Sequence, residues 1–212
     1  MPTDKPEHVV LLSGLWLPRW SLWPLAWRMH RCGFIPHLFS YRTTGCDLQE
    51  NAAALQGFLR TLPVGTMHLV AFSLGGLVVR ALFHFYPQQA LGRIVTLGTP
   101  HNGSLAAHRL VRWRWGRKMV GKSLADLMAG RPQSWALPAR ELGIVGGSMN
   151  VGLGRLVVRH TEVSDGTVSL SETRLAQATD FFCVRASHIG LLLSAASARA
   201  VCRFLRSGRF GP

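Results

Sequence analysis

The segment 69–77 has the residue types and spacing of a reactive serine. Ala71 and Gly75 lie two residues before and two residues after Ser73. Small side chains at these positions permit a sharp turn from a strand into a helix, which strains the serine backbone and lifts its hydroxyl above the edge of a sheet. We therefore interpret Ser73 as a nucleophile. The alternative is that its hydroxyl only caps the helix that follows.

A nucleophilic hydroxyl needs a neighbouring imidazole that takes its proton. Among the nine histidines, we expect His188 to have this role. It follows the apolar run 180–186, at the carboxyl end of the last expected strand, where open α/β sheets bind their ligands. His160, after the apolar run 156–158, is the second candidate. His101 lies in a tight turn, where we expect it to hold the loop.

A carboxylate that accepts a hydrogen bond from the imidazole would fix its tautomer. Asp165 lies in the turn sequence 163–168, between two β-rich segments and 23 residues before His188. We expect Asp165 to be this acid. The alternative is that it only opens the turn, because Asp-Gly is a common turn pair. The competing acids are Glu162, Glu172 and Asp180.

Acyl transfer also needs two N–H donors aimed at the developing oxyanion. We expect one from Leu74, directly after the nucleophile, and the other from Leu15, in the loop after the first strand. Gly14 gives that loop unusual backbone freedom. Trp16 and Leu17, with Trp20 beyond them, would form an apolar approach for substrate. Ordinary packing of these side chains is an equally good explanation.

Strand-like and helix-like segments alternate, which predicts βαβ units and a parallel sheet covered on both faces, an α/β fold. We expect strands at His8–Ser13, Phe34–Tyr41, Thr66–Phe72, Gly92–Leu97, Glu141–Gly146 and Asp180–Ala186. We expect helices at Trp23–Cys32, Asp47–Leu62, Leu74–Tyr86, Ser104–Gly130 and Ile189–Leu205, and a loop at 130–138. Asp47 and Glu50 have the spacing of a capping box. Without repeats or low-complexity segments, residues 1–212 are predicted to form one domain.

These segments together resemble the α/β-hydrolase superfamily, in particular its small bacterial lipase-like and esterase-like branch. The matching segments are 71–76, 95–104, 165–168, 172–175 and 187–191. The resemblance implies a mainly parallel sheet between helices, a triad of Ser73, Asp165 and His188, oxyanion donors at Leu15 and Leu74, and no cofactor or metal. Two departures are Ala71 in place of a motif glycine and Ser13 in place of the histidine usual before Gly14. Only 105–138 could form a lid, so the cap is small or absent.

The composition is that of a globular, strongly basic protein. Apolar residues make up 48% and charged residues 16%, and the net charge is +14. No apolar run reaches the roughly 18 residues that span a bilayer, and no signal peptide is evident, so we expect a cytoplasmic location. The four cysteines lack a metal-site or C-x-x-C spacing, and we expect reduced, mostly buried thiols. Nucleic-acid binding is suggested by charge alone.

A basic stretch with interleaved tryptophans lies where a lid would sit, between Arg109 and Lys122. Its other members are Arg112, Trp113, Arg114, Trp115, Arg117 and Lys118. Cationic and indole side chains suit contact with an anionic membrane surface, although a solvated helix face explains them equally well.

The leading functional hypothesis is a carboxylic-ester hydrolase, for a small-molecule or lipid ester. A thioesterase or acyltransferase could use the same triad. A hypothesis of another class is a noncatalytic lipid-binding or interaction protein on a hydrolase frame. The oligomeric state is left open by the sequence.

Overall fold

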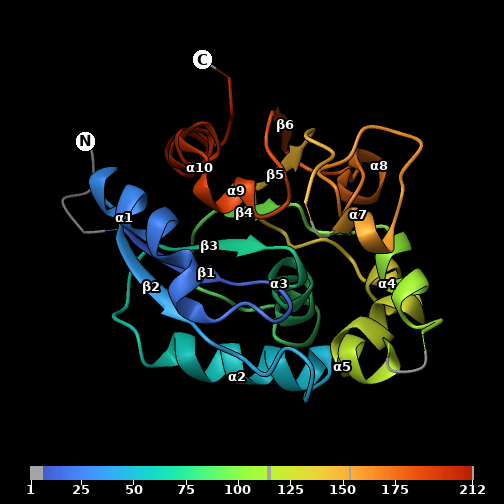
Figure 1. The fold of residues 1–212 in the computed structure, drawn as a ribbon. Coiled ribbons are helices and arrows are strands. Elements are labelled where there is room, and N and C mark those ends of the chain that lie inside the picture. The colour runs from blue at the N-terminus through green and yellow to red at the C-terminus, as the bar shows by residue number, and fades with distance from the viewer. Residues whose placement is uncertain (1–6, 114–115, 153, 212) are drawn as a thin grey trace.

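The computed structural model describes residues 7–113, 116–152 and 154–211, without the side chains of residues 117–119. Its centre is a sheet of six parallel strands in the order β2-β1-β3-β4-β5-β6 (Figure 1). They are β1 His8–Leu12, β2 Ile35–Phe39, β3 Met67–Phe72, β4 Ile94–Leu97, β5 Leu142–Gly147 and β6 Asp180–Val184. The predicted parallel α/β sheet is confirmed.

Helices cover both faces of this sheet (Figure 1). One face carries α1 (Trp23–Arg31), α9 (Gly190–Leu193) and α10 (Ala195–Ser207). The other face carries α2 (Leu48–Arg60) and α3 (Leu74–Phe85). Short elements complete the chain: η1 (Arg19–Leu22), α7 (Gly154–Val157) and α8 (Leu170–Thr173).

Strand β1 illustrates how an uninterrupted apolar run specifies a central strand. Val9 and Leu11 join the apolar cluster under α1 and α10, whereas Val10 and Leu12 join the cluster under α2 and α3. Successive side chains of a strand point to opposite faces, so a strand buried on both faces is apolar at every position.

The sequence signals at helix ends predict the structure correctly at one helix and incorrectly at another. The Asp47 carboxylate accepts a hydrogen bond from the Glu50 N–H at 2.8 Å and Glu50 reciprocates, which confirms the predicted capping box. The single closing helix predicted at Ile189–Leu205 is wrong. Ser194 has an extended backbone there and caps α10 by accepting from the Ser197 N–H, which separates α9 from α10.

The single helix predicted at Ser104–Gly130 is also wrong, because the segment forms α4 (Leu105–Leu110) and α5 (Gly116–Met128). Within α5, Gly121 has a positive φ of 71°. A side chain there would collide with Thr44, whose carbonyl accepts a hydrogen bond from the Lys122 N–H. The predicted loop at 130–138 contains the short helix α6 (Arg131–Ser134).

The same segment is anchored to the start of α2. The Asp126 carboxylate accepts a hydrogen bond from the Leu48 N–H at 3.0 Å, and the Asn51 amide bonds the Ser123 hydroxyl at 3.0 Å. Leu110, Val120, Leu124 and Leu127 are buried in the apolar cluster under α2 and α3. The buried side chains of this segment therefore belong to the core under α2 and α3.

The cysteine prediction is wrong for one pair, because Cys32 and Cys202 form a disulfide with a Cα–Cα distance of 6.4 Å. Cys46 and Cys183 are free thiols, and Cys183 is exposed rather than buried. The bond joins the end of α1 to α10 across 170 residues of sequence, a contact that spacing could not reveal.

We expect reduction of this disulfide to lower the free energy of unfolding by roughly 2–5 kcal/mol, because the bond closes a long loop in the unfolded chain. Denaturant unfolding of a Cys46→Ser, Cys183→Ser protein, with and without reductant, measures this difference. The same protein carrying Cys202→Ser should be indifferent to reductant. Equal midpoints for the oxidised and reduced protein would contradict the expectation.

None of the helices in the described part of the chain has the length and apolar character that crossing a bilayer requires.

Candidate functional site

The strand order places a topological switch point at the carboxyl ends of β1 and β3. From β1 the chain passes over one face of the sheet to β2, and from β3 it passes over the other face to β4. The loops that leave β1 and β3 therefore diverge, and such switch points are where open α/β sheets bind ligands. Residues 13–17 follow β1, and Ser73 follows β3 directly.

Ser73 has the strained backbone that its small neighbours permit, with φ 53° and ψ −121°. Its hydroxyl makes no capping hydrogen bond to α3, so the helix-cap alternative does not describe this serine. Gly75 lets the start of α3 pack closely on the end of β1, because a Cβ there would lie 2.8 Å from the Ser13 carbonyl oxygen. The Thr99 hydroxyl donates a hydrogen bond to the Ser73 carbonyl oxygen at 2.8 Å, which helps to hold the turn in place.

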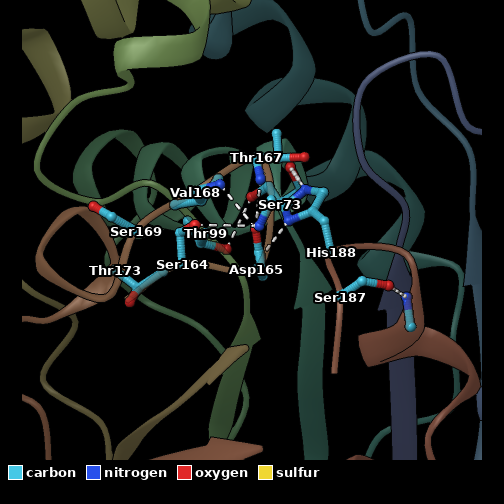
Figure 2. Close-up of polar contacts among 12 residues, drawn as sticks. Ser73, Thr99, Ser164, Asp165, Thr167, Val168, Ser169, Thr173, Ser187 and His188 are labelled. Carbon is cyan, nitrogen blue, oxygen red and sulfur yellow. Dashed lines mark hydrogen bonds and ion pairs between the residues drawn. The ribbon is translucent and has the colours of Figure 1, made fainter. Parts of the chain in front are cut away.

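Ser73, His188 and Asp165 lie in one hydrogen-bonded chain (Figure 2). The Ser73 Oγ is 3.0 Å from His188 Nε2, and His188 Nδ1 is 2.6 Å from Asp165 Oδ2. The three residues come from the ends of β3 and β6 and from the loop before α8. A hydroxyl, an imidazole and a carboxylate in this order can transfer a proton from the hydroxyl and stabilise the imidazolium that results.

The Asp165 carboxylate is fully buried, and both of its oxygens take part in hydrogen bonds. Its Oδ1 accepts hydrogen bonds from the N–H groups of Thr167 at 2.9 Å and Val168 at 2.8 Å (Figure 2). The backbone N–H of His188 donates a hydrogen bond to the backbone carbonyl oxygen of Asp165 at 2.9 Å. These contacts leave Oδ2 for the imidazole and fix the relative position of acid and base.

The other candidate histidines have partners elsewhere. His160 Nε2 is 3.1 Å from the Thr167 carbonyl oxygen. His101 is buried, with its Nε2 3.0 Å from the Thr96 hydroxyl, and burial followed by the Arg80 charge lowers its pKa to about 3. His101 is therefore neutral at ordinary pH and serves to hold the loop after β4, as its turn sequence suggests.

The competing acids also have separate contacts. Glu162 is exposed, and the Ser171 hydroxyl at 2.5 Å, with that of Ser169, lowers its pKa. Glu172 forms a capping box with Ser169 on α8 and accepts from the Leu105 N–H at 2.5 Å. Asp180 accepts from the Phe210 N–H at 2.7 Å.

Arg80 is a structural residue that the sequence reasoning missed. It is buried on α3, and its guanidinium donates to the carbonyls of His101 at 3.3 Å and Trp135 at 3.1 Å. Burial lowers its pKa to about 10. The guanidinium thereby ties α3 to the loop after β4, and only its place on an otherwise apolar helix could have drawn attention to it.

The loop after β1 lies against the start of α3. The Tyr41 hydroxyl donates to the Ser13 carbonyl at 2.7 Å, and a Cβ on Gly14 would lie 3.0 Å from Ser73 Cβ. Within the described residues, the Leu15 N–H has no hydrogen-bond acceptor. The N–H of Leu74, as the first residue of α3, has no acceptor within its helix. Two backbone donors, one in the loop after β1 and one directly after Ser73, thus lack a backbone acceptor among the described residues.

The residues predicted to form an apolar approach have different environments. Leu17 is half-buried and packs against the cluster under α1. Trp16 has a positive φ of 59°, and its N–H bonds the Thr43 hydroxyl at 3.4 Å. The side chains of Trp16 and Trp20 are more than half exposed, so packing in the core does not account for them.

The basic stretch is only partly described. Arg109, Arg112, Trp113 and Lys122 are exposed on and near α4 and α5. Arg114 and Trp115, and the side chains of Arg117 and Lys118, lie outside the described residues. The described part of the chain contains no group of three or more His, Cys, Asp or Glu side chains that could hold a metal ion.

Comparison with known proteins finds similarity in structure rather than in sequence. No protein-family model and no curated protein matches the chain. The crystal structure of a Bacillus licheniformis lipase in mature form is similar with a TM-score of 0.79 and 20% identity, over 98% of this chain and 96% of that one. A metagenomic carboxyl esterase has a TM-score of 0.65 and 17% identity, over 88% and 68%. A Paleococcus ferrophilus monoacylglycerol lipase has a TM-score of 0.65 and 15% identity, over 96% of both chains.

Proposed function

Because this chain has the α/β-hydrolase fold, we propose that it is a serine hydrolase of carboxylic esters, with Ser73 as nucleophile, His188 as general base and Asp165 as the acid that orients it. The observation that carries the proposal is the contact of His188 with both Ser73 Oγ and Asp165 Oδ2. The fold is shared with the lipases and esterases named above, which favours an ester over other acyl substrates.

In the first half of the proposed reaction, Ser73 Oγ attacks the acyl carbon while its proton moves to His188 Nε2. The carbonyl oxygen becomes an oxyanion, and the N–H groups of Leu15 and Leu74 donate to it. The Asp165 carboxylate stabilises the imidazolium through Nδ1–H. Collapse of the tetrahedral intermediate breaks the ester bond, and His188 returns the proton to the leaving alcohol.

In the second half, a water molecule attacks the acyl-enzyme, and His188 Nε2 again takes the proton. The carboxylic acid leaves, and Ser73 recovers its hydrogen. The strained turn supports this order of reaction steps, because it keeps the Ser73 hydroxyl free of capping contacts and half-exposed at the carboxyl end of β3.

The substrate class is tested with a panel of p-nitrophenyl esters of increasing acyl length, run beside the matching acyl thioesters. We expect the wild-type protein to hydrolyse the esters with the higher kcat/KM. Turnover of thioesters alone would favour the thioesterase alternative, and turnover of neither by a folded protein would contradict an ester hydrolase.

Lipid contact through the basic stretch 109–122 stays a prediction. Its exposed members support it, but α4 and α5 also contribute to the core, so the stretch is not a free surface helix.

A further inference from the structure

Four exposed tryptophans lie on one short segment that follows β1. Trp16, Trp20, Trp23 and Trp27 are each between 53% and 66% exposed. The last three, with Arg31, are spaced by three and four residues along η1 and α1, which places them on one face. We call Trp16, Trp20, Trp23 and Trp27 the tryptophan surface. Exposed side chains of this size, gathered on one segment, indicate a partner surface.

The tryptophan surface borders the open edge of the sheet. An open groove of about 690 Å³ is lined by Trp20 and Trp23, by the outer strand β2, by Phe58 of α2 and by Leu62 just after α2. In Figure 1, α1 and α2 lie on opposite sides of β2. Trp20 lies five positions after Leu15, so the segment that carries the tryptophan surface begins in the loop after β1.

Strand β2 is a poor template for a partner strand. The Ile35 N–H bonds the Glu7 carbonyl on the inner side, so the nitrogen of the next residue faces outward. That residue is Pro36, which has no N–H to donate, and proline at an edge blocks strand addition. An apolar partner therefore has to dock on side chains rather than on the strand backbone.

The segment that carries the tryptophan surface has charged side chains of one sign only. The sequence contains no acidic residue between Glu7 and Asp47. Arg19 and Arg31 are exposed, and the Arg31 guanidinium lies 4.9 Å from the centroid of the Trp27 ring. Indole rings with adjacent cations match the headgroup region of an anionic bilayer, where the rings lie at headgroup level and the cations meet lipid phosphates.

We propose that the tryptophan surface, with Arg19 and Arg31, docks this protein on anionic lipid bilayers. The exposed rings enter the headgroup layer, and the two guanidinium groups bind lipid phosphates. If the proposed function holds, this orientation would bring lipid esters to the loop after β1. The docking itself needs no catalysis and is tested without it.

The test measures sedimentation of the full-length Ser73→Ala protein with vesicles of phosphatidylcholine alone and of phosphatidylcholine with phosphatidylglycerol. We expect binding that requires the anionic lipid and weakens at high salt, as screening demands. Replacing Trp20, Trp23 and Trp27 with Ser should lower the partition coefficient by about 100-fold or more, since each ring loses much of its apolar contact with the bilayer.

The matched control replaces three exposed apolar residues elsewhere, as Leu91→Ser, Trp113→Ser and Leu156→Ser. It should leave vesicle binding within about threefold of the parent, since surface changes away from the docking face are near neutral. A second pair compares Arg19→Gln, Arg31→Gln with Arg109→Gln, Arg112→Gln, and only the first pair should weaken binding to anionic vesicles. Thermal unfolding of each variant checks the fold.

Three results would overturn the proposal. The first is a parent protein that binds neither kind of vesicle. The second is equal binding by the parent and the folded triple tryptophan variant. The third is a stronger effect from the Arg109, Arg112 pair, which would assign docking to the basic stretch. If analytical ultracentrifugation shows a dimer that the triple variant disrupts while vesicle binding is unchanged, the tryptophan surface joins two copies of the chain instead.

Discussion

Ser73→Ala should abolish ester hydrolysis and leave the fold intact. The substitution removes the atom that forms the acyl-enzyme, and loss of a serine nucleophile costs roughly 10⁶-fold in kcat in comparable enzymes. The hydroxyl makes no capping hydrogen bond, and its contact is with His188 Nε2, so alanine leaves no buried group unpaired in the core. Steady-state hydrolysis of the best p-nitrophenyl ester measures the effect.

A matched control for this variant is Ser171→Ala, which removes an unrelated hydroxyl that bonds Glu162. It should keep wild-type activity. A Ser73→Ala protein with the wild-type melting temperature and unchanged turnover would show that another residue is the nucleophile.

Asp165→Asn should lower kcat by roughly 10⁴-fold with little change in structure. Oδ1 accepts from two backbone N–H groups, so the amide oxygen of asparagine would occupy that position. The NH₂ group would then face His188 Nδ1 and donate to it. The single proton of the neutral imidazole then lies on Nε2, so Nε2 can no longer accept the proton of Ser73.

Glu162→Gln is the matched control for this carboxylate, because Glu162 is exposed and bonded to Ser171 rather than to His188. It should retain activity. Glu172→Gln should act on stability, since it weakens the cap of α8 and the contact with Leu105. If either change reduces kcat more than Asp165→Asn does, the acid has been misassigned.

Much of the sheet could be predicted because its strands carry strong local signals. The run after His8 is apolar at every position, and the structure uses each position to fill one of two cores. The small residues around Ser73 likewise reflect a steric requirement of the strand-to-helix turn, so this turn could be predicted without a structure. The place of His188 after the last expected strand and of Asp165 in a turn before it predicted that they lie near Ser73, and the family resemblance implied the same three residues.

The errors arose where contacts between distant segments decide the structure. Gly121 breaks α5 because Thr44 lies against it, and Cys32 meets Cys202 because α1 and α10 pack side by side. Neither pairing has a signature in local sequence. Helical periodicity also cannot distinguish one long helix from two helices separated by a capping serine, as at Ser194.

The exposure of the tryptophans is another feature that could not be predicted from the sequence. Their type suggests burial, and a sequence offers no means of telling a packed ring from an exposed one at helical spacing. The structure leaves Trp20, Trp23 and Trp27 exposed, and Trp20 and Trp23 line the groove beside the outer strand.

The most direct test of the nucleophile is covalent labelling with an active-site serine phosphonate probe, followed by mass spectrometry of the labelled peptides. A serine activated by His188 should displace the leaving group of the probe and form one adduct, on the peptide that contains Ser73. Ser73→Ala should abolish labelling, and Asp165→Asn should slow it. A folded wild-type protein that does not react, or an adduct on a residue other than Ser73, would contradict a serine hydrolase at this site.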